Sequence, residues 1–226
     1  MRLALTRGSA LNPALDLLTA AGLPVEPLRA APREPVTELA DGTSVALLRP
    51  ADVPAYVEAG AADVGIAGKD WLLEQGRDLY ELLDLQILPG RLVFAQPGEA
   101  TEGRRRRLGR LRVATPYQNV TRRYFGQSGR QVEVIPLQDD AELAPRLGLA
   151  DGIVILVRSD STLHDAGLRE RAEIAHSTLR LVVSRAAHTL LSTEIEGLTA
   201  RLRPCRPSLP PSPSSPPSPP APTEEQ

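Results

Sequence analysis

A loop rich in hydroxyl groups follows an apolar segment in the second half of the chain. Residues 152–157 predict a buried strand, and directly after them come Arg158, Ser159, Asp160, Ser161 and Thr162. The residues that follow indicate the start of a helix. Backbone amides in the first turn of a helix, together with serine and threonine hydroxyls, can bind a phosphate. A turn with an ordinary helix cap uses the same residue types, so this segment alone leaves both interpretations open.

Charged residues also follow two predicted strands in the first half of the chain. They are Arg49, at the end of one strand, and Gly68, Lys69, Asp70 and Trp71, just beyond the next. A cation can clamp a phosphate, and a carboxylate can accept a hydrogen bond from a base or a sugar. The glycine permits close backbone approach, and the tryptophan could stack on a purine. A surface salt pair and a half-buried tryptophan are the alternatives.

Short apolar segments alternate with helical patterns along most of the chain. We expect strands at 2–6, 43–48, 63–67, 91–96, 111–114, 131–135, 152–157, near 173 and at 179–183. We expect helices at 12–18, 50–58, 69–74, 121–127, 141–149 and 185–202, the last one capped by Ser184. This alternation is typical of βαβ units with mostly parallel sheets. Ligands gather at the carboxyl ends of such strands, which points to loops 6–9, 67–71, 115–119 and 158–162.

Two sets of alternating elements, with the last segments returning to the first set, predict a bilobed α/β fold with a cleft between the lobes. Residues 1–96 and 178–203 are expected to form lobe I, and residues 97–177 lobe II. From residue 204 to residue 226 proline and serine dominate, so we expect a disordered tail that forms no packed core. Residues 104–107 are four arginines, which form either a solvated loop or a contact to polyphosphate.

Composition excludes several classes of protein. The net charge of −2 gives no reason to expect nonspecific binding to nucleic acid or to an anionic membrane. The single cysteine, Cys205, can form neither an intramolecular disulfide nor a cysteine metal cluster. The three histidines lack the spacing of metal ligands, so no metal site made by the protein alone is expected. No apolar run approaches the roughly 20 residues of a membrane span, and we expect a cytoplasmic protein.

Several segments, in the same order, resemble the ATP phosphoribosyltransferase family. In the first, Arg49-Pro50 starts a helix and Gly68-Lys69-Asp70 follows a strand. The others are 78–85, 112–115, 119–125 and 142–151. The resemblance covers about residues 2–200, and because independent motifs occur in order it is specific. The chain most resembles the short form of the catalytic subunit, which lacks a C-terminal regulatory domain.

The resemblance implies a fold similar to type II periplasmic binding proteins and a glycosyltransferase activity. The family joins N1 of ATP to C1 of phosphoribosyl pyrophosphate with release of pyrophosphate, using Mg²⁺, as the first step of histidine biosynthesis. The short form works in a hetero-oligomer with a regulatory partner that resembles histidyl-tRNA synthetase. By analogy, the ATP site would contain Arg7, Arg49, Gly68, Lys69, Asp70 and Trp71. The phosphoribosyl pyrophosphate site would contain Arg158, Ser159, Asp160, Ser161 and Thr162, supported by Thr115, Glu142 and Asp151.

The chain departs from the family pattern at several of these positions. Ile155 stands where the family usually has aspartate, Asp160 where it has glycine, and Arg158 at a variable glutamate position. Ser9 and Pro116 replace a common arginine and a common lysine. An isoleucine cannot accept a hydrogen bond from ribose, and a carboxylate beside a phosphate is repulsive. Two alternatives therefore remain beside the active enzyme: a catalytically impaired paralogue with a regulatory or structural role, and a small-molecule binding protein.

Overall fold

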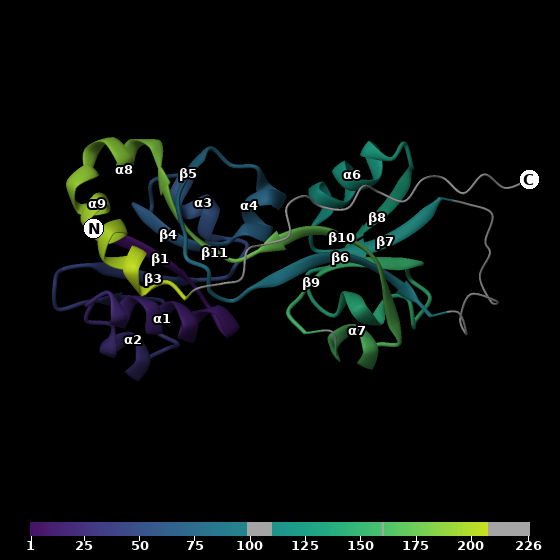
Figure 1. The fold of residues 1–226 in the computed structure, drawn as a ribbon, viewed down its shortest axis with the longest axis horizontal. Helices are drawn as coiled ribbons and strands as arrows, with labels where there is room; N and C mark the ends of the chain where they lie inside the picture. The colour runs from purple at the N-terminus through teal and green to yellow at the C-terminus, as the bar shows by residue number, and fades with distance from the viewer. Residues whose placement is uncertain (99–109, 160, 208–226) are drawn as a thin grey trace, which may run out of the picture. The chain divides into compact units, whose positions relative to one another are not determined.

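The computed structural model describes residues 1–98, 110–159 and 161–207 of the chain. These residues form two compact α/β units (Figure 1). The first unit contains residues 1–89 and 178–207, and the second contains the described residues between 90 and 177. The prediction that residues 90–96 belong to the first lobe is wrong, because the strand that contains them pairs with strands of the second sheet. The cleft expected between the lobes stays a prediction.

The first unit is built on a six-stranded mixed sheet, with the order β2-β3-β1-β4-β11-β5. The strands are β1 (Arg2–Thr6), β2 (Val36–Glu38), β3 (Ser44–Leu48), β4 (Val64–Gly68), β5 (Leu79–Asp84) and β11 (Leu179–Ser184). Strand β1 pairs in parallel with β3 on one side and with β4 on the other. Strand β11, which comes from the far end of the chain, lies between β4 and β5 and is antiparallel to both (Figure 1).

Helices cover both faces of this sheet because alternate strand residues point to opposite sides. The helices are α1 (Leu11–Ala20), α2 (Glu26–Ala30), α3 (Val53–Glu58), α4 (Lys69–Gln75), α8 (Arg185–Leu190) and α9 (Ser192–Leu202), with short 3₁₀ turns at Gly8–Ala10 and Arg203–Cys205. Leu3 and Leu5 of β1 belong to the same buried cluster as residues of α1 and α9. Ala4, between them, packs in the cluster that contains Val53 and Val57 of α3. The first unit is therefore a three-layer structure.

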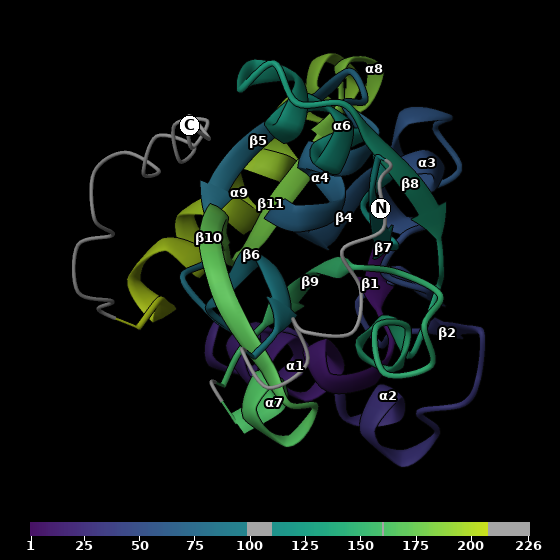
Figure 2. The ribbon, with the colours of Figure 1, turned by 90° about the vertical axis from the view of Figure 1, so that its right-hand side faces the viewer.

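The second unit contains a five-stranded mixed sheet with the order β10-β6-β9-β7-β8. Its strands are β6 (Gly90–Pro97), β7 (Leu111–Thr115), β8 (Val132–Pro136), β9 (Gly152–Val157) and β10 (Leu168–Ser177). Strands β8, β7 and β9 are parallel, and β10 runs antiparallel beside β6 (Figure 2). Helix α6 (Gln118–Gln127) packs aromatic residues on one face, and α7 (Ser161–Asp165) and the 3₁₀ turn Ala141–Leu143 cover the other.

Two predicted helices differ from the structure. The helix expected at 141–149 is only the 3₁₀ turn Ala141–Leu143 followed by turns, because Pro145 lacks an amide donor and Gly148 adopts φ +81°. The helix expected at 185–202 is broken at Leu191, which has φ −122° and ψ 32°, although Ser184 does cap it by accepting from the amide of Ala187 at 3.1 Å. Of the shorter elements, α2 and β2 were not expected.

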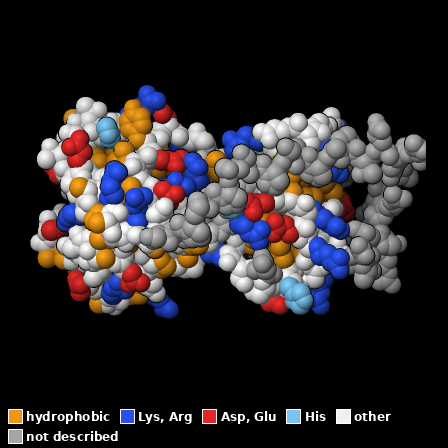
Figure 3. All heavy atoms as spheres, viewed as in Figure 1, with side chains coloured by type: hydrophobic (Ala, Val, Ile, Leu, Met, Phe, Trp, Pro, Cys, Tyr) orange, Lys and Arg blue, Asp and Glu red, His pale blue; other side chains and the backbone are white. Residues whose placement is uncertain are grey.

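The folded part of the chain also extends past residue 203, where the tail was predicted to begin. Cys205 packs against the core of the first unit, and Nη1 of Arg206 donates to the backbone oxygen of Asp84 at 3.0 Å. Residues 208–226 of the predicted tail and the arginines at 104–107 lie outside the described residues. Among the described residues, no helix is both long and apolar enough to cross a membrane. On the face drawn in Figure 3, acidic and basic side chains are interspersed.

Candidate functional site

Three basic residues follow three neighbouring parallel strands of the first unit. Arg49 comes directly after β3, Arg7 directly after β1, and Lys69 directly after β4. The register pairs Thr6 of β1 with Leu48 of β3, so the carboxyl ends of these strands meet at one edge of the sheet. We call Arg7, Arg49 and Lys69 the cationic edge. Three cations placed after neighbouring parallel strands, at their carboxyl ends, are suited to binding an anionic ligand.

Backbone groups fix the first member of the cationic edge. The amide of Arg7 donates to the backbone oxygen of Leu48 at 2.7 Å, and its Nε donates to that of Leu47, also at 2.7 Å. Both acceptors belong to the neighbouring strand β3. The guanidinium of Arg7 is therefore anchored through one nitrogen, while Arg7 and Arg49 are both exposed to solvent. An anchored and exposed guanidinium is suited to binding a phosphate.

The segment after β4 is shaped by the contact between Gly68 and Asp70. Asp70 is almost completely buried, with 3% exposure, in the first turn of α4. A Cβ atom at position 68 would overlap the carboxylate of Asp70, so a larger residue there would have to displace that carboxylate. The ammonium of Lys69 forms an ion pair with Glu81 of β5. Trp71, the fourth residue predicted here, is half-buried in the same helix, as the packing alternative also expected.

In the second unit, the hydroxyl-rich loop lies where β9 ends. Arg158 and Ser159 follow the strand and are exposed, and Ser161 and Thr162 begin α7. The hydroxyls of Ser159 and Ser161 are 2.8 Å apart, and the amide of Thr162 donates to the backbone oxygen of Ser159 at 3.2 Å. The loop therefore presents hydroxyls and a cation from the carboxyl end of a strand. Asp160, which was predicted to contribute to this site, lies outside the described residues.

The three residues predicted to support this site lie at different places. Thr115 is completely buried at the end of β7, where its hydroxyl donates to the backbone oxygen of Val154 at 2.6 Å and accepts from the amide of Tyr117 at 2.9 Å. Glu142 is half-buried in the 3₁₀ turn after β8. Asp151 precedes β9, so it lies at the amino end of the strand whose carboxyl end carries Arg158. Thr115 and the loop after β9 are therefore at one edge of the sheet, and Asp151 is at the other.

Asp151 forms one of two similar ion pairs, one in each unit. Its carboxylate accepts from the amide of Arg112 at 3.0 Å and from Nη2 of the same residue at 2.8 Å. In the first unit the carboxylate of Asp63, just before β4, accepts from the amide of Arg2 at 2.7 Å and from its guanidinium. Hydrogen bonding to Asp151 raises the pKa of Arg112. Burial alone would raise the pKa of Asp63, but the hydrogen bonds and charge of Arg2 hold it below its usual value. Both pairs fasten parallel strands together.

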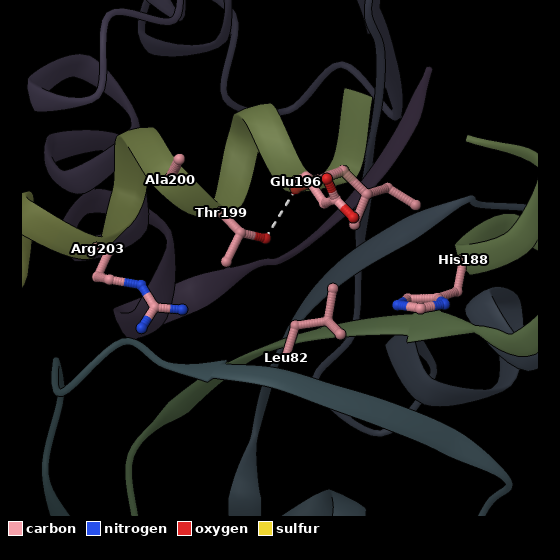
Figure 4. A pocket seen from close by; sticks show the side chains of 7 residues that line it. Leu82, His188, Glu196, Thr199, Ala200 and Arg203 are labelled. Atoms are coloured by element: carbon pink, nitrogen blue, oxygen red, sulfur yellow. Dashed lines mark hydrogen bonds between the residues drawn. The ribbon is translucent and has the colours of Figure 1, made fainter. Parts of the chain in front are cut away.

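A pocket of about 300 Å³ lies elsewhere in the first unit. Helix α9 contributes most of its wall, with His188 from α8 and Leu82 from β5 at the opposite side (Figure 4). The hydroxyl of Thr199, which faces it, already donates to the backbone oxygen of Ile195 at 2.7 Å. None of the residues that line it is among those predicted for a substrate, so we do not include it in the candidate site.

Comparison with known proteins bears on the function of the cationic edge and of the loop after β9. A family model described as HisG, ATP phosphoribosyltransferase, matches residues 49–204. An ATP phosphoribosyltransferase from Rubrobacter xylanophilus is 42% identical over 203 residues, which cover 88% of this chain and 94% of the relative. One from Ectopseudomonas mendocina is 42% identical over 205 residues, covering 90% of this chain and 95% of the relative. The chain belongs to the ATP phosphoribosyltransferase family.

Solved structures agree with this assignment. A structure described as the ATP phosphoribosyl transferase (HisG:HisZ) complex from Thermotoga maritima matches with a TM-score of 0.78 and 30% identity, covering 91% of this chain and 97% of that chain. The alkanesulfonate-binding protein SsuA from Xanthomonas axonopodis matches with a TM-score of 0.54 and 16% identity, covering 91% of this chain and 72% of that chain, which supports the fold alone. The predicted fold, similar to type II periplasmic binding proteins, is confirmed.

As a member of this family, the chain is a transferase that acts in the first step of histidine biosynthesis. The reaction of this family joins N1 of ATP to C1 of phosphoribosyl pyrophosphate and releases pyrophosphate. At position 155, where this chain departs from the family pattern, the isoleucine is buried. Ile155 is 7% exposed on β9 and belongs to a buried apolar cluster with Leu163 of α7 and Leu168 of β10. This side chain is therefore part of the core beneath the hydroxyl-rich loop.

Proposed function

We propose that this chain is an active catalytic subunit that binds the phosphates of ATP at the cationic edge. The observation that carries the proposal is the position of Arg7, Arg49 and Lys69 after three adjacent parallel strands. We further propose that the loop after β9 binds the 5′-phosphate of phosphoribosyl pyrophosphate through Arg158 and the hydroxyls of Ser159, Ser161 and Thr162. The exposure of these residues at the carboxyl end of β9 supports that role.

The chemistry of the reaction suits such residues. Breaking the bond between C1 and pyrophosphate develops positive charge on the ribose and negative charge on the leaving group. Fixed cations stabilise that negative charge, and positioning of the two substrates supplies most of the remaining rate enhancement. The chain contributes the anchored guanidinium group of Arg7, which needs little rearrangement when charge develops. Asp70, held in place beside Gly68, would accept a hydrogen bond from the ATP moiety.

We propose that Mg²⁺ enters the reaction with the substrates. Among the described residues, no group of three or more His, Cys, Asp or Glu side chains could hold a metal ion. Magnesium usually keeps several waters and binds through one or two carboxylates together with substrate phosphates. This mode needs no cluster of three protein ligands. When bound, the ion would neutralise charge on pyrophosphate, while the cationic edge would orient the phosphate groups.

We also propose a partner and a location for the chain. The Thermotoga maritima relative is described as a HisG:HisZ complex and is 30% identical to this chain over 97% of its own length. By this similarity, we propose a hetero-oligomer with a regulatory subunit that resembles histidyl-tRNA synthetase. A cytoplasmic location, where ATP and phosphoribosyl pyrophosphate are available, is part of the same proposal.

The decisive experiment measures release of pyrophosphate from ATP and phosphoribosyl pyrophosphate, with and without the regulatory partner. Arg49→Ala and Asp70→Asn should each raise the KM for ATP by about tenfold or more, because a charge-assisted hydrogen bond contributes about 1.5–3 kcal/mol. Arg29→Ala is the control, since Arg29 pairs with Asp16 on an exposed surface of the same unit. An unchanged KM for ATP in both site variants would remove Arg49 and Asp70 from the ATP site.

The same assay tests the second candidate function, an impaired paralogue with a regulatory or structural role. The burial of Ile155, where the family usually has an aspartate, favours this candidate. It predicts no release of pyrophosphate even with the partner present. It also predicts that the chain still assembles with that partner, which size-exclusion chromatography would detect.

A further inference from the structure

Asp84, the last residue of β5, connects its own segment to the start of β11. Its Oδ1 accepts from the hydroxyl of Thr178 at 2.7 Å and from the amide of Gln86 at 2.9 Å. Its Oδ2 forms an ion pair with Nη1 of Arg180 at 3.0 Å. Asp84 lies in the segment 78–85 that resembles the family, yet none of the roles assigned above uses it. So many donors on one half-buried carboxylate indicate that the position of Thr178 is tightly specified.

Thr178 connects this carboxylate to the cationic edge. It is the residue at which the chain re-enters the first unit, and it lies between strands β10 and β11. Its backbone oxygen accepts from the amide of Lys69 at 3.0 Å, next to the pairing of Leu179 with Gly68. One residue, Thr178, therefore contacts Asp84 through its side chain and Lys69 through its backbone.

The start of helix α4 depends on this contact. The first amides of a helix have no partner within the helix and are usually satisfied by a capping side chain. The N-cap of α4 is Gly68, which has no side chain to offer, and a side chain there would displace the carboxylate of Asp70. Instead, the backbone oxygen of Thr178 accepts a hydrogen bond from the first of these amides, that of Lys69. Rotation of the Thr178 peptide would leave that amide unpaired.

We propose that Asp84 and Thr178 are positioning residues for phosphoribosyl transfer, which fix the first turn of α4 and hence Lys69. The inference rests on the proposed role of Lys69 in binding ATP. Asp84 holds the hydroxyl of Thr178, this hydrogen bond sets the direction of the Thr178 backbone oxygen, and that oxygen fixes the amide of Lys69. Neither residue contacts substrate in this scheme. Its consequence is that a hydroxyl outside the cationic edge controls the affinity for ATP.

The test compares Thr178→Val with Thr178→Ser in the full chain, by steady-state release of pyrophosphate with the partner present. Valine keeps the shape but removes the donor, and we expect the KM for ATP to rise about threefold to tenfold. The KM for phosphoribosyl pyrophosphate should stay within error, and serine should restore the natural KM for ATP. Thr189→Val is the matched control, because the hydroxyl of Thr189 donates to the backbone oxygen of Arg185 on exposed helix α8. We expect that control to behave like the natural chain.

Two further variants keep the outcome decisive. Asp84→Asn retains an oxygen that can accept from Thr178, so it should raise the KM for ATP less than Thr178→Val does, and it replaces that variant if valine prevents folding. Lys69→Met separates the inference from the proposed function. If Lys69→Met weakens ATP binding but Thr178→Val does not, the positioning role is wrong and the ATP site stands. If Lys69→Met has no effect on ATP binding, the proposed role of Lys69 and the positioning role of Thr178 are both wrong. Equal losses for the two substrates, or no rescue by serine, would also overturn the inference.

Discussion

Replacing Ile155 by the aspartate that the family usually has at this position should destabilise the chain strongly. Ile155 is 7% exposed and packs among apolar side chains beneath the loop after β9. Truncating a buried isoleucine typically costs about 2–5 kcal/mol, and the buried carboxyl group adds a desolvation cost. We therefore expect Ile155→Asp to lower the free energy of unfolding by about 3–5 kcal/mol at pH 7. Ile155→Val, the control, should cost about 1 kcal/mol.

The loss should depend on pH in a defined direction. Burial would raise the pKa of the introduced carboxyl group above its value in the unfolded chain, about 3.9. The folded state would then bind the proton more tightly than the unfolded state, so the free energy of unfolding falls as pH rises through this range. The difference between Ile155→Asp and the natural chain should therefore be smaller at pH 4 than at pH 7. Urea unfolding followed by far-ultraviolet circular dichroism at both pH values measures it.

One result would refute this reasoning. Suppose that the free energy of unfolding of Ile155→Asp at pH 7 lies within about 0.5 kcal/mol of that of the natural chain. The side chain at this position then reaches solvent and is not part of the core. A simultaneous fall in the KM for phosphoribosyl pyrophosphate would then show that the aspartate can bind ligand in this chain. If instead the variant is destabilised as expected, restoring activity at this site would require repacking of the residues around it.

Three further outcomes are expected. Gly68→Ala should raise the KM for ATP at least about tenfold while the fold persists, because a Cβ there displaces the Asp70 carboxylate but the backbone suits alanine; steady-state kinetics and circular dichroism check it. Asp63→Asn should lower the free energy of unfolding by about 1–2 kcal/mol at pH 7 and by less at pH 2. The reason is that Arg2 lowers the pKa of Asp63, so the stabilisation exists above the unfolded pKa and is lost as pH falls through the folded pKa; urea unfolding at both pH values checks it. Deleting residues 207–226 should change neither the melting temperature nor the rate of pyrophosphate release, and a large loss of either would mean that this segment binds the folded part.

Much of the fold could be predicted because short apolar segments are strong local signals of buried strands. The sequence predicts β1 at its observed bounds, and β3, β4 and β9 within about a residue. Strand β5 was not predicted as a strand, since its pattern Leu-Tyr-Glu-Leu-Leu-Asp does not alternate. Its place in the sheet comes from pairing with β11, about 100 residues further along the chain. Such a pairing leaves no trace in local periodicity.

For the candidate site too, the sequence predicts the position of some residues and not of others. Arg49 and Lys69 could be predicted because a basic residue directly after a parallel strand must lie at the carboxyl edge. Asp151 precedes its strand, and the same rule would have placed it at the amino edge, as it does Asp63. Asp84 and Thr178 could not be paired from the sequence, because 94 residues separate them. Their hydrogen bond depends on the topology of the whole first unit.

The position of β11 has a consequence for the order in which the chain folds during synthesis. The second unit is encoded without interruption, but the first needs Leu179–Ser184 to fill the gap between β4 and β5. Until the ribosome has made that segment, both strands keep unpaired edges, which are prone to pairing with other chains. At about 5–20 residues per second, the roughly 100 residues between β5 and the end of β11 take about 5–20 seconds to appear. During this interval the inserted unit can fold, while β4, which carries Lys69 at its end, remains exposed to chaperones and to neighbouring nascent chains.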